Sequence, residues 1–569
     1  MFSIFDNRWN QIIAGSTRKN EQAPVVFLIG DSTVKNGKGE GDGDMWGWGD
    51  FFDYFFDRSR ISVENHALGG RSSRTFFTEG LWDKVLPGIK KGDYLFIQFG
   101  HNDGGPLNTG RARASLKGIG EESQTVIMER TGGPEEVFTY GHYLRIFVRQ
   151  AKAHGANVII LSPTPGNRWA DGHMKRFTDR YTAWASEVAR NEGVSFIDLN
   201  DISAKKFEAM GEEKTKAFYK DGVHTRYNGA ILNCKSIIQG LNALTNFSLN
   251  NYVDKKALNR EYKAADKPLF RDPKFDGAAD PTLIWNKKEQ RWFMFYTNRR
   301  ANMKETHGVD WVHGTPIGIA ESTDGGATWK YRCDAKITYG GKDYTYWAPD
   351  VIEEGGIYHM FLTIVPGTFT DWAHEREIVH LTSTDLIDWT FQAKVKLASD
   401  KVIDAGLIKT SAGLWRMYYN NERDNKSIYY SESKDLVNWK NYGKAIWDRR
   451  GEGPKVFQWK GKYFMIVDNW DGLGVYSSND MENWMRQPKN ILQGGGNGLD
   501  DGTQGQHADV VVNNGRAYIF YFTHPGRTGA AAKVDTPDTR RSSLQVAELK
   551  YKNGEIYCDR DNPVYINLK

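Results

Sequence analysis

A short motif recurs four times in the second half of the chain and limits the folds that this half can adopt. Each copy places a serine and an aspartate ahead of a tryptophan, and the copies end at Trp329, Trp389, Trp439 and Trp484. These positions are 60, 50 and 45 residues apart, a spacing that suits a four-stranded blade and is typical of β-propellers. We interpret the tryptophans as blade packing rather than as platforms for sugar rings.

Short strands of alternating pattern surround these motifs. Examples are RWFMFYT, IYHMFLTIV, LWRMYYN, KYFMIVD and AYIFYFT, with no helical stretch between them. Five strand-rich units and four tryptophan motifs predict five blades, of which the last lacks the motif. We therefore predict an all-β five-bladed β-propeller over residues 270–569.

The first half of the chain has a different rhythm. Its apolar runs VVFLIG, ISVENHAL, YLFIQFG, NVIILSPT and VSFIDL alternate with longer amphipathic segments, several of which close on a glycine. Such alternation implies right-handed crossovers and a parallel sheet with helices on both faces. We predict an α/β/α domain with a flavodoxin-like parallel sheet over residues 1–245, followed by a polar, lysine-rich linker over residues 246–269.

The length of the chain predicts two or three domains, and its composition excludes some partners. The 569 residues are 39% apolar, and 75 basic residues nearly balance 71 acidic ones, which argues against a nucleic-acid partner. No run reaches the roughly 18 apolar residues of a membrane span. The first 24 residues lack an apolar core and a cleavage site. The protein is therefore expected to be cytoplasmic, or else periplasmic or secreted with its export signal removed.

Polar residues at the ends of the predicted parallel strands suggest a serine esterase. Ser32 lies in GDSTV, Gly70 in LGGRSSRTF, Asn102 in QFGHND, and Asp221 and His224 in DGVHTRYNGA. Acyl transfer by serine needs a base, a group that orients the base, and donors for the oxyanion. In this interpretation Ser32 is the nucleophile, His224 the base and Asp221 the orienting group. The backbone N–H groups of Ser32 and Gly70 and the Asn102 amide bind the oxyanion.

Each of these motifs alone has a plain structural explanation, since Ser and Asp often begin helices and Gly-Gly often forms turns. Together and in order, the four blocks resemble the SGNH, or GDSL, hydrolase superfamily. GDSTV, GGRSSRTF, FGHND and RASLKGIGEES are similar to its rhamnogalacturonan acetylesterase branch, carbohydrate esterase family 12. The resemblance covers most of residues 25–240 and implies removal of acetyl groups from pectic or related polysaccharide without a cofactor. A lipase-like esterase would instead need an apolar acyl groove.

A second set of candidate residues opens the innermost strand of each blade, where side chains face the central channel. The set is Asp280 in AADPTLIW, Asp350 in YWAPDVIEEG, Asp404 in VIDAGLIKT, Glu452 in GEGPKVFQW, and His507 with Asp509 in GQHADVVV. Glycosidic hydrolysis needs two carboxyl groups that face each other across a sugar, and a ring of blades can supply them. The alternative, that these acids cap turns, fits Asp404 best and Glu452 worst.

This half of the chain resembles glycoside hydrolase family 43 through the DP after Ala279, the APD ending at Asp350 and the EGP starting at Glu452. The resemblance implies that Asp280 is the general base, that Glu452 is the general acid and that Asp350 orients the acid and tunes its pKa. It also implies inversion of configuration, for which roughly 6.5–9.5 Å is expected between the two catalytic carboxyl groups.

Further residues of the propeller are expected to bind substrate. Trp347 directly precedes APD and is interpreted as a subsite residue, with Asp404 and His507 beside it. By the resemblance, His507 corresponds to an axial histidine near a cation or a water, so a calcium ion in the channel is permitted but not required. Trp46 and Trp48 are expected to pack a helix after Ser32 rather than to bind sugar.

The preferred function combines both sites in one plant-polysaccharide-degrading chain. An acetylesterase would remove acetyl groups from an acetylated cell-wall glycan, and an exo-glycosidase of arabinofuranosidase, xylosidase or galactosidase type would then cleave the deacetylated glycan. In the alternative, the propeller is a glycan-binding module without catalysis. A scaffold without any catalysis would leave both sets of residues unexplained.

Overall fold

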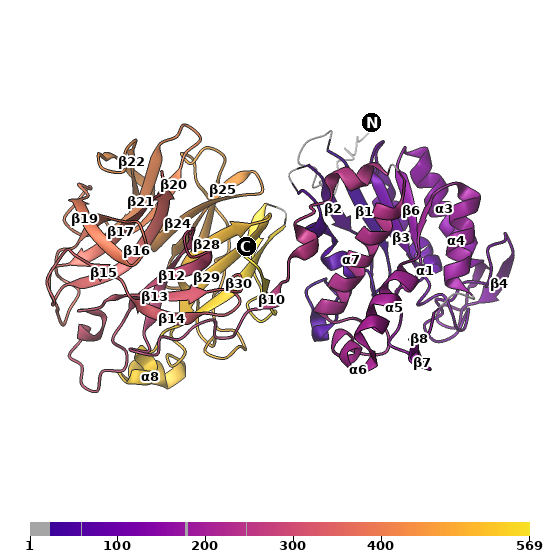
Figure 1. The fold of residues 1–569 in the computed structure, drawn as a ribbon, viewed down its shortest axis with the longest axis horizontal. Coiled ribbons are helices and arrows are strands. Elements are labelled where there is room, and N and C mark those ends of the chain that lie inside the picture. Colours follow the sequence, from indigo (N-terminus) through magenta and orange to yellow (C-terminus); the bar gives the residue numbers. More distant parts are fainter. Residues whose placement is uncertain (1–22, 59, 177–179, 246, 553) are drawn as a thin grey trace, which may run out of the picture. The chain divides into compact units, whose positions relative to one another are not determined.

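A computed structural model describes residues 23–58, 60–176, 180–245, 247–552 and 554–569 (Figure 1). The chain forms two compact units, Met1–Arg260 and Glu261–Lys569. The expectation about an export signal falls mostly on residues 1–22, which lie outside the described residues. No helix in the described ranges is long and apolar enough to cross a membrane.

The first unit contains the predicted parallel sheet. Its order is β2-β1-β3-β6-β9, and every neighbouring pair is parallel. The strands are β1 (Val25–Gly30), β2 (Ser62–Asn65), β3 (Tyr94–Gln98), β6 (Asn157–Leu161) and β9 (Ser195–Ile197). Because β1 lies inside the sheet and is fully buried, the turn that follows it opens at the carboxyl edge, where α/β folds bind ligands.

Helices cover both faces of this sheet, as the α/β/α prediction requires (Figure 1). The helices are α1 (Ser73–Thr78), α2 (Leu81–Val85), α3 (Tyr140–Ala153), α4 (Tyr181–Glu192), α5 (Leu199–Met210), α6 (Glu212–Thr215) and α7 (Tyr227–Ala243). Val25, Phe27 and Ile29 share one core with residues of α1 to α4. On the other face α7 packs closely on β9, because a Cβ on Gly240 would lie 2.3 Å from Ile197. Two short hairpins, β4 (Ser123–Ile127) with β5 (Pro134–Phe138) and β7 (Trp169–Ala170) with β8 (His173–Met174), complete the unit.

The helix expected after Ser32 is absent from this described segment. A turn follows β1, and three short 3₁₀ helices then run over Asp42–Asp44, Trp48–Asp50 and Phe52–Phe55. Trp48 is completely buried and donates its Nε1–H to Gln98 at 2.7 Å. Trp46 packs on Phe51, so both tryptophans have structural roles, as expected, but in a turn-rich segment.

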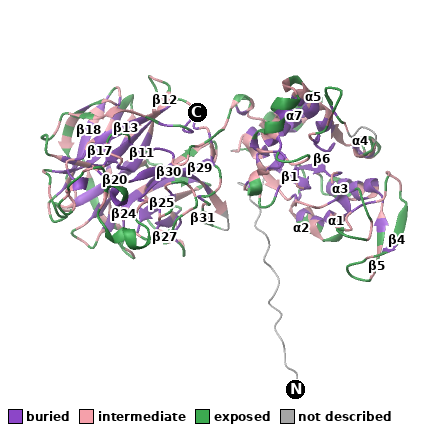
Figure 2. Ribbon diagram, turned by 90° about the horizontal axis from the view of Figure 1, so that it is seen from below, coloured by how far each residue is buried: buried purple, intermediate pink, exposed green. Residues whose placement is uncertain are grey.

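The second unit confirms the predicted five blades, each an antiparallel four-stranded sheet. The first blade consists of β11 (Ala278–Asn286), β12 (Arg291–Asn298), β13 (Ile317–Ser322) and β14 (Lys330–Asp334), and the second of β16 (Thr345–Glu354), β17 (Ile357–Val365), β18 (Glu377–Ser383) and β19 (Asp388–Lys394). The third consists of β20 (Val402–Lys409), β21 (Trp415–Asn421), β22 (Ser427–Ser433) and β23 (Lys440–Ile446), and the fourth of β24 (Glu452–Trp459), β25 (Lys462–Asp468), β26 (Leu473–Ser478) and β27 (Met485–Arg486). The fifth consists of β28 (Gln506–Asn513), β29 (Arg516–Thr523), β30 (Ser543–Lys552) and β31 (Glu555–Tyr557). A short β15 (Lys336–Ile337) pairs with β19, and helix α8 (Pro537–Arg540) lies between β29 and β30. The strands of both units carry most of the buried residues (Figure 2).

The repeated tryptophan motif shapes the turn between the third and fourth strands of four blades. In the second blade, Asp385 accepts the backbone N–H groups of Ile387 and Asp388, and Ser383 bonds its carboxylate. The turn thereby directs Trp389 into the core between blades, where it is completely buried. These contacts support the interpretation of the motif as packing.

Strand pairing between the first and last segments closes the ring of blades, and hydrogen bonds join neighbouring blades near its axis. Strand β10 (Lys263–Ala264) pairs with β32 (Tyr565–Ile566), which joins the first and last segments of the unit. The propeller therefore begins within the segment 246–269 that was expected to be a linker. Between blades, carboxylates accept backbone N–H groups of the next blade, as Asp509 does from Leu283 at 2.7 Å and Asp404 from Gly453 at 3.0 Å.

Candidate active sites

The structure brings Ser32 and His224 together although they are 192 positions apart in the chain. Ser32 lies in the turn after β1, and His224 lies just before α7. Ser32 Oγ and His224 Nε2 are 2.9 Å apart, and His224 Nδ1 lies 2.8 Å from Asp221 Oδ2. The three side chains form a continuous relay, in the order that proton transfer from a serine requires.

Hydrogen bonds hold the Asp221 carboxylate in place and keep it ionised. The backbone N–H groups of Val223 and His224 each donate to Asp221 Oδ1 at 2.7 Å. Partial burial acts to raise the pKa of Asp221, but the hydrogen bonds from His224 and Val223 outweigh it and lower that pKa overall. An ionised carboxylate at this point fixes the tautomer of His224 that leaves Nε2 free to accept the Ser32 proton.

The predicted oxyanion donors line the same cavity, whose volume is about 380 Å³. Gly70 has φ +79°, a left-handed conformation that glycine adopts without strain. Asn102 donates one amide hydrogen to the carbonyl of Arg71 at 2.9 Å, which fixes the orientation of the amide. Ser32, Gly70, Asn102 and His224 all line the cavity, whereas Asp221 supports His224 from outside it.

A buried aspartate supports the loops that carry these donors. Asp103, next to Asn102, accepts hydrogen bonds from the backbone N–H and the hydroxyl of Ser73 at the start of α1, and from the hydroxyl of Ser115. Burial raises the pKa of Asp103 to about 7, although the hydrogen bonds from Ser73 act to lower it. Asp103 therefore ties the segment after Gly70 to the segment that carries Asn102.

Two arginines of this cavity were missed from the sequence. Arg111 and Arg113 both line it, and Arg113 donates to the carbonyl of Gly70 at 3.2 Å. Within the described ranges Arg111 forms no hydrogen bond or ion pair. The segment RASLKGIGEES contains Arg113, but charged residues in an irregular segment are usually solvated surface, so periodicity gave no signal for either residue.

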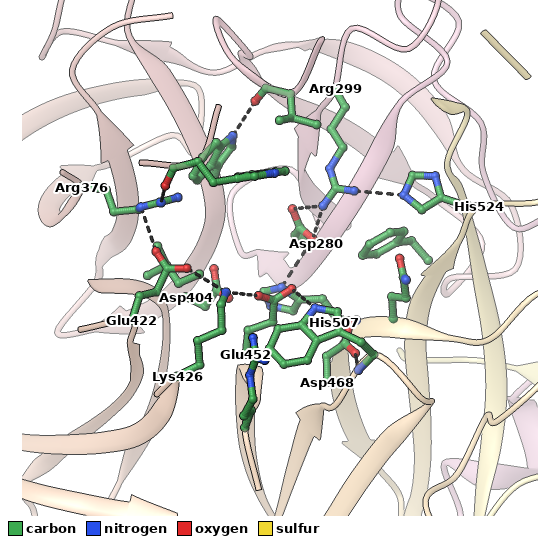
Figure 3. A pocket seen from close by; sticks show the side chains of 18 of the residues that line it. Asp280, Arg299, Arg376, Asp404, Glu422, Lys426, Glu452, Asp468, His507 and His524 are labelled. Carbon is green, nitrogen blue, oxygen red and sulfur yellow. Dashed lines mark hydrogen bonds and ion pairs between the residues drawn. The ribbon is translucent and has the colours of Figure 1, made fainter. Parts of the chain in front are cut away.

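The propeller holds a second and larger cavity of about 580 Å³ at the start of its inner strands (Figure 3). The predicted residues that line it are Asp280, Trp347, Asp404, Glu452 and His507. Trp347 is 8% exposed and donates its Nε1–H to Val312 at 2.7 Å, so it presents part of its ring to the cavity. Asp350 does not line the cavity.

A bulge in each inner strand explains why Asp350 differs from Asp404. The two-residue bulges begin at Asp280, Ala348, Asp404, Gly453 and His507, and the position after each bulge holds Thr282, Asp350, Gly406, Lys455 and Asp509. Asp404 is thus equivalent to Asp280, whereas Asp350 lies in the next layer. None of the five residues after the bulges lines the cavity.

The structure places Asp350 outside the cavity, in contacts between blades. Its carboxylate accepts the backbone N–H of Leu407 at 2.7 Å and pairs with Lys455 at 2.8 Å, and Lys455 also pairs with Asp509. The sequence itself could have indicated this difference. The inner strands begin AADPT, YWAPD, IDAG, EGPK and QHAD, and when they are aligned on the Pro or Ala of the bulge, Asp404 occupies the same position as Asp280. In the structure it is Asp404, not Asp350, that lines the cavity together with Glu452.

Of the five carboxyl groups that line the cavity, the three predicted from the sequence have distinct environments (Figure 3). Asp280 pairs with Arg299 at 3.1 Å. Glu452 accepts the Nε1–H of Trp470 at 3.1 Å and lies 3.4 Å from Lys426 Nζ. Burial raises the pKa of Asp404 well above its usual range, and the charges of Glu452 and Asp280 add to the effect.

The surroundings of His507 do not fit a calcium ion. His507 Nδ1 lies 3.5 Å from Asp280 Oδ1, and its ring packs on Gly453, where a Cβ would approach it to 2.6 Å. Calcium takes six to eight oxygen ligands. Among the described residues no group of three or more His, Cys, Asp or Glu side chains could hold a metal ion, and Arg299 already supplies positive charge to Asp280.

Comparison with known proteins found similar proteins for each half. Residues 28–230 match the GDSL-like Lipase/Acylhydrolase family. The rhamnogalacturonan acetylesterase of Emericella nidulans is 34% identical over 209 residues, which cover 37% of this chain and 80% of that protein. The probable rhamnogalacturonan acetylesterase YesY of Bacillus subtilis is 29% identical over 226 residues, 38% of this chain and 93% of the relative. The solved structure of a thermostable family-43 glycoside hydrolase is 18% identical, with a TM-score of 0.38, and covers 51% of this chain and 94% of that one.

Proposed function

The chain belongs to the GDSL-like lipase/acylhydrolase family and is an esterase through residues 28–230, and we propose that this unit removes acetyl groups from an acidic plant polysaccharide. The observation that carries the proposal is the relay of Ser32, His224 and Asp221, with 2.9 and 2.8 Å between successive side chains. Ser32, the first residue of this relay, lines a cavity together with the proposed oxyanion donors Gly70 and Asn102.

The proposed reaction begins when Ser32 Oγ attacks the acetyl carbonyl carbon while His224 Nε2 takes the hydroxyl proton. The carbonyl oxygen becomes an oxyanion that the Ser32 and Gly70 N–H groups and the Asn102 amide stabilise. Collapse of this intermediate breaks the ester C–O bond, and His224 protonates the leaving sugar oxygen, which becomes a hydroxyl group. Water, deprotonated by His224, then attacks the acetyl-serine, so acetate leaves and Ser32 regains its proton.

The names of the relatives and the charge of the cavity both favour a pectic substrate. Two of the relatives described above are rhamnogalacturonan acetylesterases or probable ones. Arg111 and Arg113 place positive charge beside Ser32, which suits an acidic polymer that carries carboxylates next to its acetyl esters. An apolar acyl groove, which a lipase-like esterase would need, is not what lines this cavity.

Acetate release from acetylated rhamnogalacturonan tests this proposal. The Ser32→Ala variant should lose about three or more orders of magnitude in kcat, while an Arg111→Gln variant should keep activity on a small chromogenic acetate but lose activity on the acidic polymer. Ser32→Ala with unchanged acetate release would overturn the assignment. Equal loss on both substrates in Arg111→Gln would instead refute the role of charge in substrate choice.

For the propeller we propose an inverting exo-glycosidase. Asp280 would deprotonate the attacking water, and Glu452 would protonate the leaving oxygen from the opposite side of the sugar. Asp404, not Asp350, would orient Glu452, because Asp404 and Glu452 line the same cavity and their charges interact. The resemblance and the positions of Asp280, Asp404 and Glu452 around one cavity support this proposal, and the separation of roughly 6.5–9.5 Å remains a prediction.

The alternative, a propeller that binds glycan without cleaving it, makes a different prediction. A catalytic propeller loses sugar release in Glu452→Gln, measured on a panel of aryl arabinofuranosides, xylosides and galactosides, whereas acetate release is unchanged. The Lys440→Gln variant, with an exposed substitution on β23, is the matched control and should behave as the parent. Glycan binding without Glu452-dependent sugar release by the parent would favour the binding module.

A further inference from the structure

Not every basic side chain that lines the cavity of the propeller is paired with a carboxylate of the described residues. Six basic side chains line it: Arg299, Arg376, Lys401, Lys426, Arg450 and Arg527. Arg376 and Lys426 both pair with Glu422, at 2.9 and 2.7 Å. Within the described part of the chain, Arg527 has no carboxylate partner.

Two contacts hold the guanidinium of Arg527 in place without pairing it with a carboxylate of the described residues. Its Nε–H donates to the carbonyl of Thr539 at 2.9 Å, and its guanidinium lies 5.7 Å from the centre of the Trp311 ring. These two contacts fix the plane of the guanidinium. The two terminal nitrogens have no hydrogen-bond partner among the described residues, although Arg527 lines the cavity together with Trp311.

The wall around Arg527 is electropositive. His524 packs its ring against Trp311 and lies 3.3 Å from Arg299 Nη1. Burial, together with the charges of Arg527 and Arg299, lowers the pKa of His524 well below its usual range, so two guanidinium groups act on this buried imidazole. Figure 3 shows Arg299 between His524 and Asp280. The only carboxylate that Arg299 contacts among the described residues is Asp280.

We propose that this wall binds the carboxylate of a uronic acid, so that the propeller acts on a glycan containing a uronic acid unit rather than on a purely neutral one. A planar guanidinium forms two parallel hydrogen bonds to a planar carboxylate, and Arg527 offers two free terminal nitrogens for them. Trp311 lines the same cavity and supports the guanidinium of Arg527 through its ring. The inference rests on the proposed glycan-binding role of the cavity and names its substrate class.

Binding of D-galacturonic acid and of its methyl ester to the full chain tests the inference by titration calorimetry or ligand-observed NMR. The ester keeps the size of the sugar and removes its charge. The parent protein should bind the acid at least about ten-fold more tightly, the scale expected for a charged hydrogen bond, and Arg527→Gln should abolish this preference. Because Arg111 in the first unit has no partner among the described residues, only the effect of Arg527→Gln assigns the preference to the propeller.

The matched control is Lys440→Gln, which removes one cation 4.7 Å from the ring of Tyr442, at a position that does not line the cavity. This variant should keep the preference for the acid. Equal binding of acid and ester by the parent, or a preference unchanged in Arg527→Gln, would overturn the inference while the propeller could still cleave neutral glycans. Preferential binding of galactose 6-sulfate over the acid would also overturn it. Tight binding of the acid without Glu452-dependent cleavage would refute only the proposed catalysis.

Discussion

Neutralising Asp103 should change how the stability of the first unit depends on pH. Asp103 is buried beside Asn102, and burial raises its pKa from 3.8 to about 7. The folded unit therefore holds the Asp103 proton more tightly than the unfolded chain does. Its stabilising effect is fully present below about pH 4 and is lost as the pH rises toward 7, because ionisation costs more in the folded state.

The size of the effect follows from the two pKa values. Each pKa unit corresponds to about 1.4 kcal/mol, so a rise from 3.8 to about 7 corresponds to about 4 kcal/mol of unfolding free energy. Asp103→Asn keeps one oxygen for Ser73 but places an NH₂ group where Oδ2 has no hydrogen-bond partner among the described residues. That loss should cost about 1–3 kcal/mol at every pH.

Urea unfolding of both proteins at pH 4.5 and pH 8 measures this difference. Circular dichroism at 222 nm follows the first unit, because the longer helices of the described residues, α3, α4, α5 and α7, all belong to it. The variant should be less stable at pH 4.5 and about equal to or more stable than the parent at pH 8. Parallel pH profiles for the two proteins, or a parent that gains more stability than the variant on going to pH 8, would refute the reasoning.

Two further substitutions test one unit each. Asn102→Ala removes a side-chain oxyanion donor and should lower kcat for acetate release by about 10²–10³-fold with little change in KM; an unchanged kcat would remove Asn102 from the oxyanion hole. Lys455→Met leaves Asp350 and Asp509 buried without their shared cation and should destabilise the propeller by about 3–5 kcal/mol in calorimetry. A propeller transition that stays in place after this change would contradict the pairing.

Features of the fold that repeat along the chain could be predicted from the sequence. The spacing of Trp329, Trp389, Trp439 and Trp484 predicted the blades because each tryptophan follows the same Ser–Asp turn. The alternation of strands and helices predicted the parallel sheet because apolar runs that are buried on both faces have few other solutions. Blocks around Ser32 and His224 were found because each follows or precedes a regular element.

Features that depend on contacts between distant segments could not be predicted in this way. Asp350 and Asp404 both lie near the start of an inner strand, and only the two-residue bulge and the pairing of Asp350 with Lys455 distinguish their positions. Arg111 and Arg527 lie in irregular segments, so no periodicity marks them as cavity residues. The 3₁₀ helices after Ser32 replace a predicted helix because Gly37, Gly39, Gly41 and Gly43 all adopt positive φ.

Covalent labelling of the intact chain by a fluorophosphonate tests most directly whether Ser32 is an activated nucleophile. Such a probe forms a bond to a serine oxygen only where a base removes the hydroxyl proton and an oxyanion site accepts the phosphoryl oxygen. Mass spectrometry should find one phosphonyl group per chain, on Ser32, with acetate release lost in proportion to labelling and labelling nearly abolished in His224→Ala. An unlabelled Ser32, or a fully labelled Ser32 in a chain that still releases acetate, would contradict the account.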